Sequence, residues 1–215
     1  YYSSYDGPTY ENSATYTTPI LYDNKAGAYF TNTITNPIIQ PFSSEVVEAG
    51  MDIRFMKNRL GFDLTYFVNN DGPRIFSLPI SSASGFSTAL VNGNTTRKKG
   101  WEATLTGNPI RTKSGFSWDV LVNWSTFKET LTSIYPGVDV LNVFYKVGDR
   151  IDKIYGSAFV RTPDGQLIND AGGRPLRTPR PQYLGTANPD WVWAINNTFR
   201  YKGFNLGFQF DGRVG

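Results

Sequence analysis

Three pairs of runs with alternating apolar and polar residues dominate this 215-residue chain. Residues two apart in a strand point to the same side of a sheet, so each run predicts a strand with one apolar and one polar face. A few turn residues join the two strands of each pair, whereas long stretches rich in Gly, Pro and Ser separate the pairs. The predicted strands cover residues 45–55, 60–68, 97–107, 115–127, 191–201 and 204–212.

The last pair shows the pattern most clearly, because Lys202-Gly203 is its whole connection. One face carries Trp193, Ile195, Phe199 and Tyr201, followed by Phe204, Leu206, Phe208 and Phe210. The opposite face carries Ala194, Asn196, Thr198 and Arg200, followed by Asn205, Gly207, Gln209 and Asp211. The residues that break the alternation are Phe67, Leu121 and Asn197. In the middle pair we expect the turn around Pro109 and Lys113-Ser114.

Strand length and loop order favour an antiparallel transmembrane β-barrel. Each run reaches the roughly 9–11 residues that a tilted membrane strand needs, and no stretch approaches the roughly 20 apolar residues of a membrane helix. Outer-membrane barrels have short turns at one end and longer loops at the other. Six strands are fewer than the roughly eight of the smallest single-chain barrels, so we expect a section of a larger barrel.

Three regions are predicted as long loops. Residues 1–43 show no clean period, and 69–94 contains a candidate hairpin between 74–80 and 86–91. The longest region, 128–190, holds turn residues around 166–168 that predict a short ribbon. Loops this long are usually functional.

Composition narrows the chemistry. The chain has no His and no Cys, and no carboxylates at metal-ligand spacing, so we expect no cofactor, no metal and no disulfide scaffold. The net charge of +3 is dispersed, which argues against a nucleic-acid partner. The cluster Arg97-Lys98-Lys99 sits at a strand mouth, where it is either a solvated strand end or a contact for anionic lipid headgroups.

Charged and amide side chains on the polar face are predicted to line a water-filled lumen. Asp52, Asp63, Glu102 and Asp119 could also act as a carboxylate pair for glycoside cleavage, but lumen charges balanced by Arg54 and Arg200 explain them better, and no enzyme is expected. The predicted lumen-facing residues are Glu48, Asp52, Arg54, Asp63, Glu102, Asp119, Asn123, Arg200, Gln209 and Asp211.

Aromatic residues on the apolar face are predicted to contact lipid. All five Trp have this parity, as expected for the aromatic girdles of a membrane barrel; the core of a soluble β-sandwich shows the same alternation. The predicted lipid-facing aromatics are Trp101, Phe116, Trp118, Trp124, Trp193, Phe199, Tyr201, Phe204, Phe208 and Phe210.

Several ordered blocks resemble the SusC/RagA group of TonB-dependent outer-membrane transporters. Gly100 and Glu102 match the "G-x-E" strand start of that family. The blocks are SEVVEAGMDIRFMKNRLGFDLTYFV at 44–68, RKKGWEATLTGNPI at 97–110, VGDRIDKIYGSAFVRTPDGQLI at 147–168, LGTANPDW at 184–191 and YKGFNLGFQFDGRVG at 201–215.

This resemblance implies a 22-stranded barrel in the bacterial outer membrane that imports oligosaccharides or peptides. A plug domain would couple it to TonB, and a SusD-like surface lipoprotein would cover it. We expect residues 1–215 to form part of one barrel domain, with an external loop region at 1–43, four strands at 44–127, an external loop at 128–190 and two strands at 191–215. The plug would lie outside this chain, and the partners would be outer-membrane lipid, the lipoprotein, TonB through the plug, and the rest of the barrel.

Aromatic and charged residues of the long loop are the candidate contacts for a ligand or for the lipoprotein lid. Aromatic faces stack on sugar rings, and charged groups orient hydroxyls or peptide termini; ordinary loop packing would use the same residues. The candidates are Tyr135, Phe144, Tyr145, Asp149, Arg150 and Tyr155.

Two further functions remain open at this stage. One is a secreted β-sandwich that binds carbohydrate through loop aromatics. The other is a barrel of SusC ancestry that serves as a subunit of another outer-membrane assembly.

Overall fold

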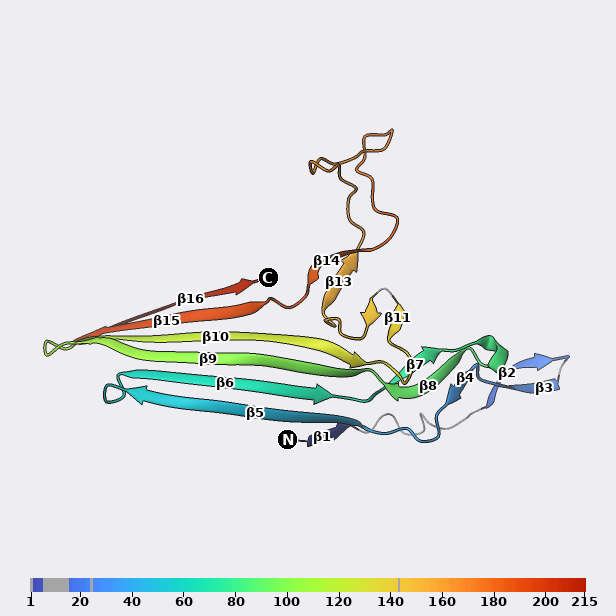
Figure 1. Cartoon of the computed structure of the whole chain (residues 1–215), viewed down its shortest axis with the longest axis horizontal. Coiled ribbons are helices and arrows are strands. Elements are labelled where there is room, and N and C mark those ends of the chain that lie inside the picture. The colour runs from blue at the N-terminus through green and yellow to red at the C-terminus, as the bar shows by residue number, and fades with distance from the viewer. Residues whose placement is uncertain (1, 6–15, 24, 143) are drawn as a thin grey trace.

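The computed structural model describes residues 2–5, 16–23, 25–142 and 144–215. Six long strands dominate it (Figure 1). They are β5 (Phe42–Phe55), β6 (Leu60–Asp71), β9 (Thr95–Arg111), β10 (Phe116–Ser133), β15 (Trp191–Tyr201) and β16 (Phe204–Val214). They correspond to the six predicted strands, although β10 begins one residue later than predicted and β9 and β10 end several residues further along the chain.

All six strands belong to one antiparallel sheet in the order β5-β6-β9-β10-β15-β16, with β1 (Tyr2–Tyr5) paired to the free side of β5. The register aligns whole rows of side chains across the sheet. One apolar row runs through Ile53, Phe62, Leu105, Val122, Ile195 and Phe210. The neighbouring row on the opposite face runs through Asp52, Asp63, Thr104, Asn123, Ala194 and Asp211. The predicted all-β, antiparallel fold is confirmed.

Three short turns lie together at one end of the sheet, and the long connections lie at the other (Figure 1). The β15–β16 turn is Lys202-Gly203, as expected, with Lys202 at φ 53°. The β5–β6 turn places Met56, Lys57 and Asn58 in the left-handed region. Such turns match the twist of the flanking strands and fix the register of each hairpin.

Pro109 lies within β9 rather than in a turn, which corrects the sequence analysis. The ladder between β9 and β10 shifts register between Trp118 and Val120, opposite Gly107 and Ile110, and the chain turns only at 112–115. A bulge tolerates proline because it leaves a residue outside the ladder.

The small strands all lie toward the long-loop end (Figure 1). The predicted hairpin is present, with β7 (Arg74–Pro79) antiparallel to β8 (Thr88–Gly93). The described residues of region 1–43 form strands that the loop prediction did not include: β2 (Tyr16–Tyr22) pairs with β3 (Lys25–Phe30), and β4 (Thr33–Thr35) pairs in parallel with β8. Parallel pairing with a strand 55 residues away leaves no local signal in the sequence.

The connection from β10 to β15 contains two short strand pairs and a ribbon. β11 (Val140–Asn142) pairs with β12 (Tyr145–Lys146), and β13 (Lys153–Gly156) pairs with β14 (Gln182–Thr186). Between β13 and β14, bridges at Arg161–Leu167 and Asn169–Pro175 form the predicted ribbon. A 3-10 turn at Ser82–Ser84 separates β7 from β8.

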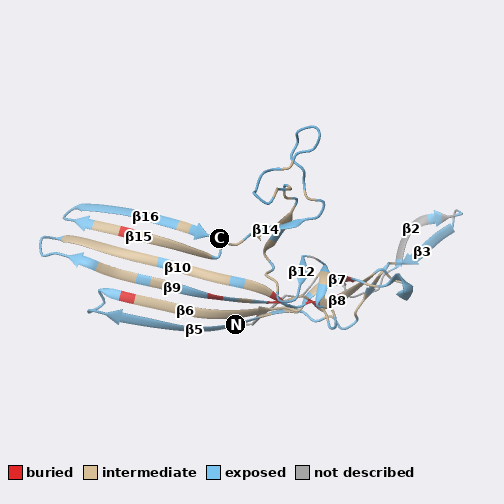
Figure 2. Ribbon diagram, turned by 45° about the horizontal axis from the view of Figure 1, so that its top comes forward, coloured by how far each residue is buried: buried red, intermediate tan, exposed pale blue. Residues whose placement is uncertain are grey.

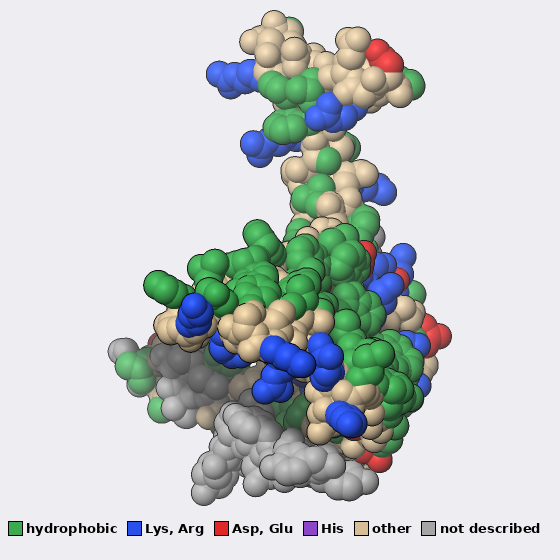
Figure 3. Space-filling view, turned by 90° about the vertical axis from the view of Figure 1, so that its left-hand side faces the viewer, with side chains coloured by type: hydrophobic (Ala, Val, Ile, Leu, Met, Phe, Trp, Pro, Cys, Tyr) green, Lys and Arg blue, Asp and Glu red, His purple; other side chains and the backbone are tan. Residues whose placement is uncertain are grey.

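Nearer the turns, the buried positions of the sheet are Gly61 of β6 and Asn197 of β15 (Figure 2). The buried apolar residues of larger size lie toward the long-loop end. Among the described residues they are Leu78, Val91, Leu131 and Ile134. In contrast, Phe204 and Phe210 of β16 are 82% and 61% exposed. Viewed from the turn end, hydrophobic side chains form an arc along the sheet (Figure 3). An apolar face of this extent requires a partner or lipid to cover it.

Candidate functional site: the polar face, the apolar face and the long loop

The polar face is held together near the turns by arginine–carboxylate contacts. Asp52 and Asp63 are directly opposite each other on β5 and β6, and Arg54 contacts both: two hydrogen bonds of 3.1 Å to Asp63 and an ion pair of 2.8 Å to Asp52. Like charges directly opposite would repel, and Arg54 offsets this repulsion by contacting both carboxylates. Arg54 fits because Gly61, its cross-strand neighbour, has no side chain in its path.

A second arginine–carboxylate contact joins β10 to β15. Arg200 pairs with Asp119, whose other oxygen accepts a 2.7 Å hydrogen bond from the Asn108 amide at the β9 bulge. Asn108 also donates to the Trp118 carbonyl oxygen at 3.2 Å, and the Arg59 guanidinium donates to the Asn108 carbonyl oxygen. The bulge therefore has a structural role: it places Asn108 beside a carboxylate of the polar face.

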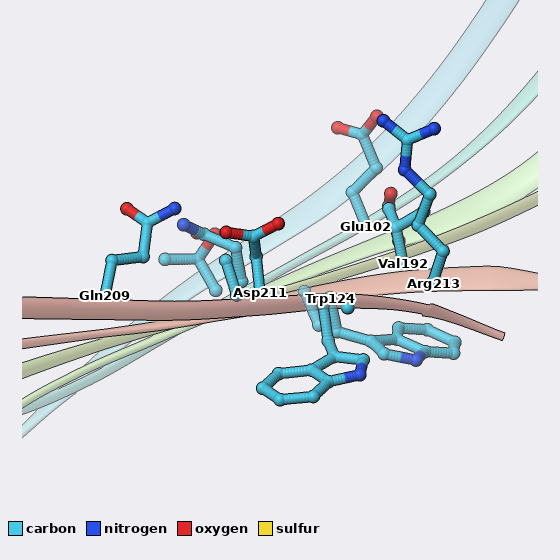
Figure 4. Close-up of a pocket in the computed structure, with 13 residues that line it drawn as sticks. Glu102, Trp124, Val192, Gln209, Asp211 and Arg213 are labelled. Atoms are coloured by element: carbon cyan, nitrogen blue, oxygen red, sulfur yellow. The ribbon is translucent and has the colours of Figure 1, made fainter.

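A groove of about 520 Å³ lies further toward the long-loop end and is lined by β9, β10, β15 and β16. Glu102, Gln209 and Asp211 project from one side of the sheet there, together with Arg213, while Trp124 projects from the other (Figure 4). Asn123 also lines the groove and accepts a 3.1 Å hydrogen bond from Thr104. Four predicted lumen-facing residues are thus brought together. The sequence analysis missed Arg213, although this residue lies two positions after Asp211 in the same strand and therefore on the same face.

These contacts suit a polar wall better than acid–base chemistry. Asp52, Asp63 and Asp119 are each engaged in a contact with an arginine. No group of His, Cys, Asp or Glu among the described residues could hold a metal ion. Within the same part of the chain, no helix is long and apolar enough to cross a membrane.

Aromatic side chains gather on the apolar face near the turns. Trp118 and Phe199 stack with ring centres 5.7 Å apart, and Phe208 continues the stack at 5.8 Å from Phe199. Phe116, Tyr201 and Phe210 flank them at 5.5–6.5 Å. Phe204 pairs with Tyr201 across the β15–β16 turn. Six predicted lipid-facing aromatics thus form one cluster, and Phe204 adjoins it.

Other aromatics of the same face lie toward the long loops. Trp124 and Trp193 are directly opposite each other, and the space beside Trp193 is kept by Gly212, where an added Cβ would lie 2.7 Å from the indole nitrogen. Trp101 packs against Tyr66 at 4.6 Å. The apolar face therefore has an aromatic group toward each end.

The three residues that break the alternation have distinct surroundings. Asn197, on the apolar face and 8% exposed, accepts a 3.1 Å hydrogen bond from the Trp118 indole. Phe67 lies on the polar face over Gly100, where an added Cβ would lie 2.7 Å from its ring. Glu48 is the cross-strand neighbour of Phe67 on that face. Leu121 pairs with Asn196 on the polar face, and nothing further explains it.

Arg150 of the long loop connects three segments. Its guanidinium donates two hydrogen bonds to Asp152, at 2.8 and 2.9 Å, and a third to Asp190 at 2.9 Å. Backbone hydrogen bonds from Leu131 to Asp149 and from Ile151 to Glu129 fasten the same segment to the end of β10. The hydrogen bond from Arg150 holds the pKa of Asp152 below its ordinary value.

Two of the other loop candidates lie in one aromatic cluster, and the remaining three have separate surroundings. Phe144 and Tyr155 contact edge to face at 4.9 Å, and Tyr183 of β14 extends the cluster 6.0 Å from Tyr155. Asp149 pairs with Lys153 at 2.8 Å, Tyr145 is exposed, and Tyr135 bridges to Val138 in a separate turn. The sequence analysis missed Tyr183 and Asp190. Tyr183 lies in a short strand whose partner is 28 residues away, so no local pattern marked it.

Sequence comparison relates the chain to TonB-dependent receptors. It is 23% identical to TonB-dependent receptor P3 of Formosa agariphila over 204 residues, and 23% identical to TonB-dependent receptor P26 of the same organism over 212 residues. These matches cover 80% and 84% of this chain, which spans about a fifth of each relative. No family model matches.

Comparison with solved structures shows which proteins share this fold. The RagAB peptide importer in its open-open state matches 96% of this chain with a TM-score of 0.73 and 15% identity, and the closed-closed state matches 100% with 0.67 and 17%. The chain corresponds to 24% and 26% of those chains. The sequence relatives are named as receptors, and the structural neighbours are named as a peptide importer. The resemblance seen in the sequence is therefore confirmed as a similarity: this chain is similar in sequence to TonB-dependent receptors and in fold to the RagAB peptide importer.

Proposed function

We propose that this chain forms part of the wall and external loops of an outer-membrane transporter that actively imports oligosaccharides or peptides. The observation that carries the proposal is the six-strand sheet with one continuous apolar face, one polar face, and all its short turns at one end. The apolar face would contact lipid, the polar face would line the lumen, and the long loops would lie outside the cell.

The edges of β5 and β16 would continue into the rest of the barrel. An isolated sheet with these open edges and this apolar face would aggregate in water, whereas a closed barrel satisfies every backbone group. Import would draw on TonB through a plug domain elsewhere in the protein. The chain itself would contribute walls and contacts and no catalysis.

The Phe144–Tyr155–Tyr183 cluster is our candidate contact for a substrate or for a SusD-like lipoprotein. It combines partly exposed aromatic faces with charged groups at Asp149 and Lys153. Arg150 would serve this site indirectly, because its carboxylate contacts hold the loop to the strand ends.

Adjacent residues on opposite faces give the sharpest test of the wall. Phe210→Arg would place a charge in lipid and should destabilise the folded barrel by about 2–4 kcal/mol, whereas Gln209→Arg faces the lumen and should be nearly neutral. The measurement is urea unfolding of the full-length protein in lipid vesicles. Equal effects of the two variants would contradict the assignment of faces.

Transport requires a separate measurement in cells that carry the full-length protein. Uptake of labelled peptides and of labelled oligosaccharides should be compared with and without TonB, and one of the two classes should accumulate only when TonB is present. TonB-independent accumulation of both classes would contradict active import.

Co-purification from detergent-solubilised membranes tests the partner. We expect a surface lipoprotein to co-purify with the barrel, whereas co-purification with a different assembly would favour recruitment of the barrel as a subunit of that assembly.

A further inference from the structure

Two lysines face each other across β9 and β10 near the long-loop end of the apolar face. Lys99 is the direct cross-strand partner of Lys128, and both are exposed. Arg97 lies two residues along on the same face, also exposed, opposite Thr130. Positive charges in directly opposite positions repel, so this arrangement is unfavourable by itself.

Neighbouring carboxylates do not neutralise the lysine pair. The ion pairs of the described residues do not involve Lys99, Lys128 or Arg97. Arg97 donates one 2.8 Å hydrogen bond from Nε to the uncharged side chain of Asn70, so its charge is not paired. Glu129 is on the opposite face, where it accepts a 2.7 Å hydrogen bond from Thr96. Asp152, near Lys128 by register, is engaged with Arg150. The arrangement therefore suits an anion from outside the chain.

An apolar groove of about 400 Å³ adjoins the lysine pair. Tyr66 and Trp101, in contact at 4.6 Å, line it together with Thr126, Lys99 and Lys128. Along these strands, the aromatic rings lie nearer the turns and the lysine ammonium groups lie nearer the long loops. A membrane surface has the same sequence of layers, because its apolar acyl chains are followed by charged headgroups.

We propose that Lys99 and Lys128, with Arg97, bind the phosphate of a lipid headgroup in the outer leaflet. The groove beside them would hold the first part of an acyl chain, which is why a phosphorylated lipid fits better than a free anion. This inference rests on the proposed function, because it needs the apolar face in lipid and the long loops outside the cell.

The test uses the full-length protein in an uncharged detergent. Binding of diphosphoryl lipid A and of the same lipid without phosphates is measured by native mass spectrometry. The double variant Lys99→Gln/Lys128→Gln should bind diphosphoryl lipid A roughly 10- to 30-fold more weakly. The matched control, Arg111→Gln/Lys113→Gln, removes two charges from the turn end of the same hairpin and should bind like wild type.

Three results would overturn the inference: equal affinity of the lysine variant and wild type, equal binding of the lipid without phosphates, or complete displacement by millimolar inorganic phosphate. Heat-dependent gel mobility of each variant shows whether its barrel is folded, and the single variants Lys99→Gln and Lys128→Gln replace the double variant if it is not. A full-length protein that is monodisperse in water without detergent would instead contradict the proposed function.

Discussion

Trp118 donates its indole hydrogen to the side-chain oxygen of Asn197, 3.1 Å away on the neighbouring strand. The bond joins β10 to β15 in the middle of an aromatic cluster on the apolar face. A polar residue that breaks the alternation is therefore satisfied by a partner from 79 residues earlier. In lipid, both groups would otherwise lack a partner.

Asn197→Ala should lower the free energy of unfolding by about 1–3 kcal/mol, because it leaves the indole hydrogen of the half-buried Trp118 without its acceptor. The measurement is urea unfolding in vesicles. Trp118→Phe is the partner variant in a double-mutant cycle, and the double variant should cost less than the sum of the two. Strict additivity would mean that the bond contributes nothing.

Gly100→Ala should destabilise the barrel by about 2 kcal/mol or more, because an added Cβ meets the Phe67 ring, the Phe127 side chain and the backbone at Thr126. The same unfolding assay applies. Gly203→Ala is the control, since its added Cβ meets nothing within 4 Å. If Gly100→Ala were as stable as wild type, the close packing of β6, β9 and β10 here would be wrong.

Arg150→Lys should loosen the segment around 147–152 without unfolding the barrel. Lysine keeps the charge but loses the two-pronged contact to Asp152 and the simultaneous contact to Asp190. Hydrogen exchange at the amides of Leu131 and Ile151 should accelerate by roughly 10-fold, as expected for loss of about 1.4 kcal/mol. Arg161→Lys, which alters an exposed contact to Gly165, should leave those amides unchanged.

Acid should weaken the same segment through Asp152. The folded-state pKa of this carboxyl lies below its ordinary 3.8 because of the hydrogen bond from Arg150, so its stabilising effect is complete well above pH 3.8 and declines as the pH falls through the folded-state value. The difference in hydrogen exchange between wild type and Asp152→Asn, corrected for intrinsic rates, should shrink below pH 3.8. A difference that stays constant from pH 6 to pH 2 would rule out this linkage.

The alternation of residue types determined the six long strands, their hairpin pairing and the sharing of one face by all five Trp, because side-chain direction in a strand depends only on position along the chain. The tertiary structure alone decided what depends on contacts between distant segments. Pro109 lies in a bulge where the Asn108 side chain bonds to Asp119. Strand β4 pairs with β8, 55 residues away, and Tyr183 contacts Tyr155 beside Phe144. Arg150 likewise gains its partner Asp190 from 40 residues away. Local periodicity carries no information on such pairs, because they form only when the hairpins lie side by side.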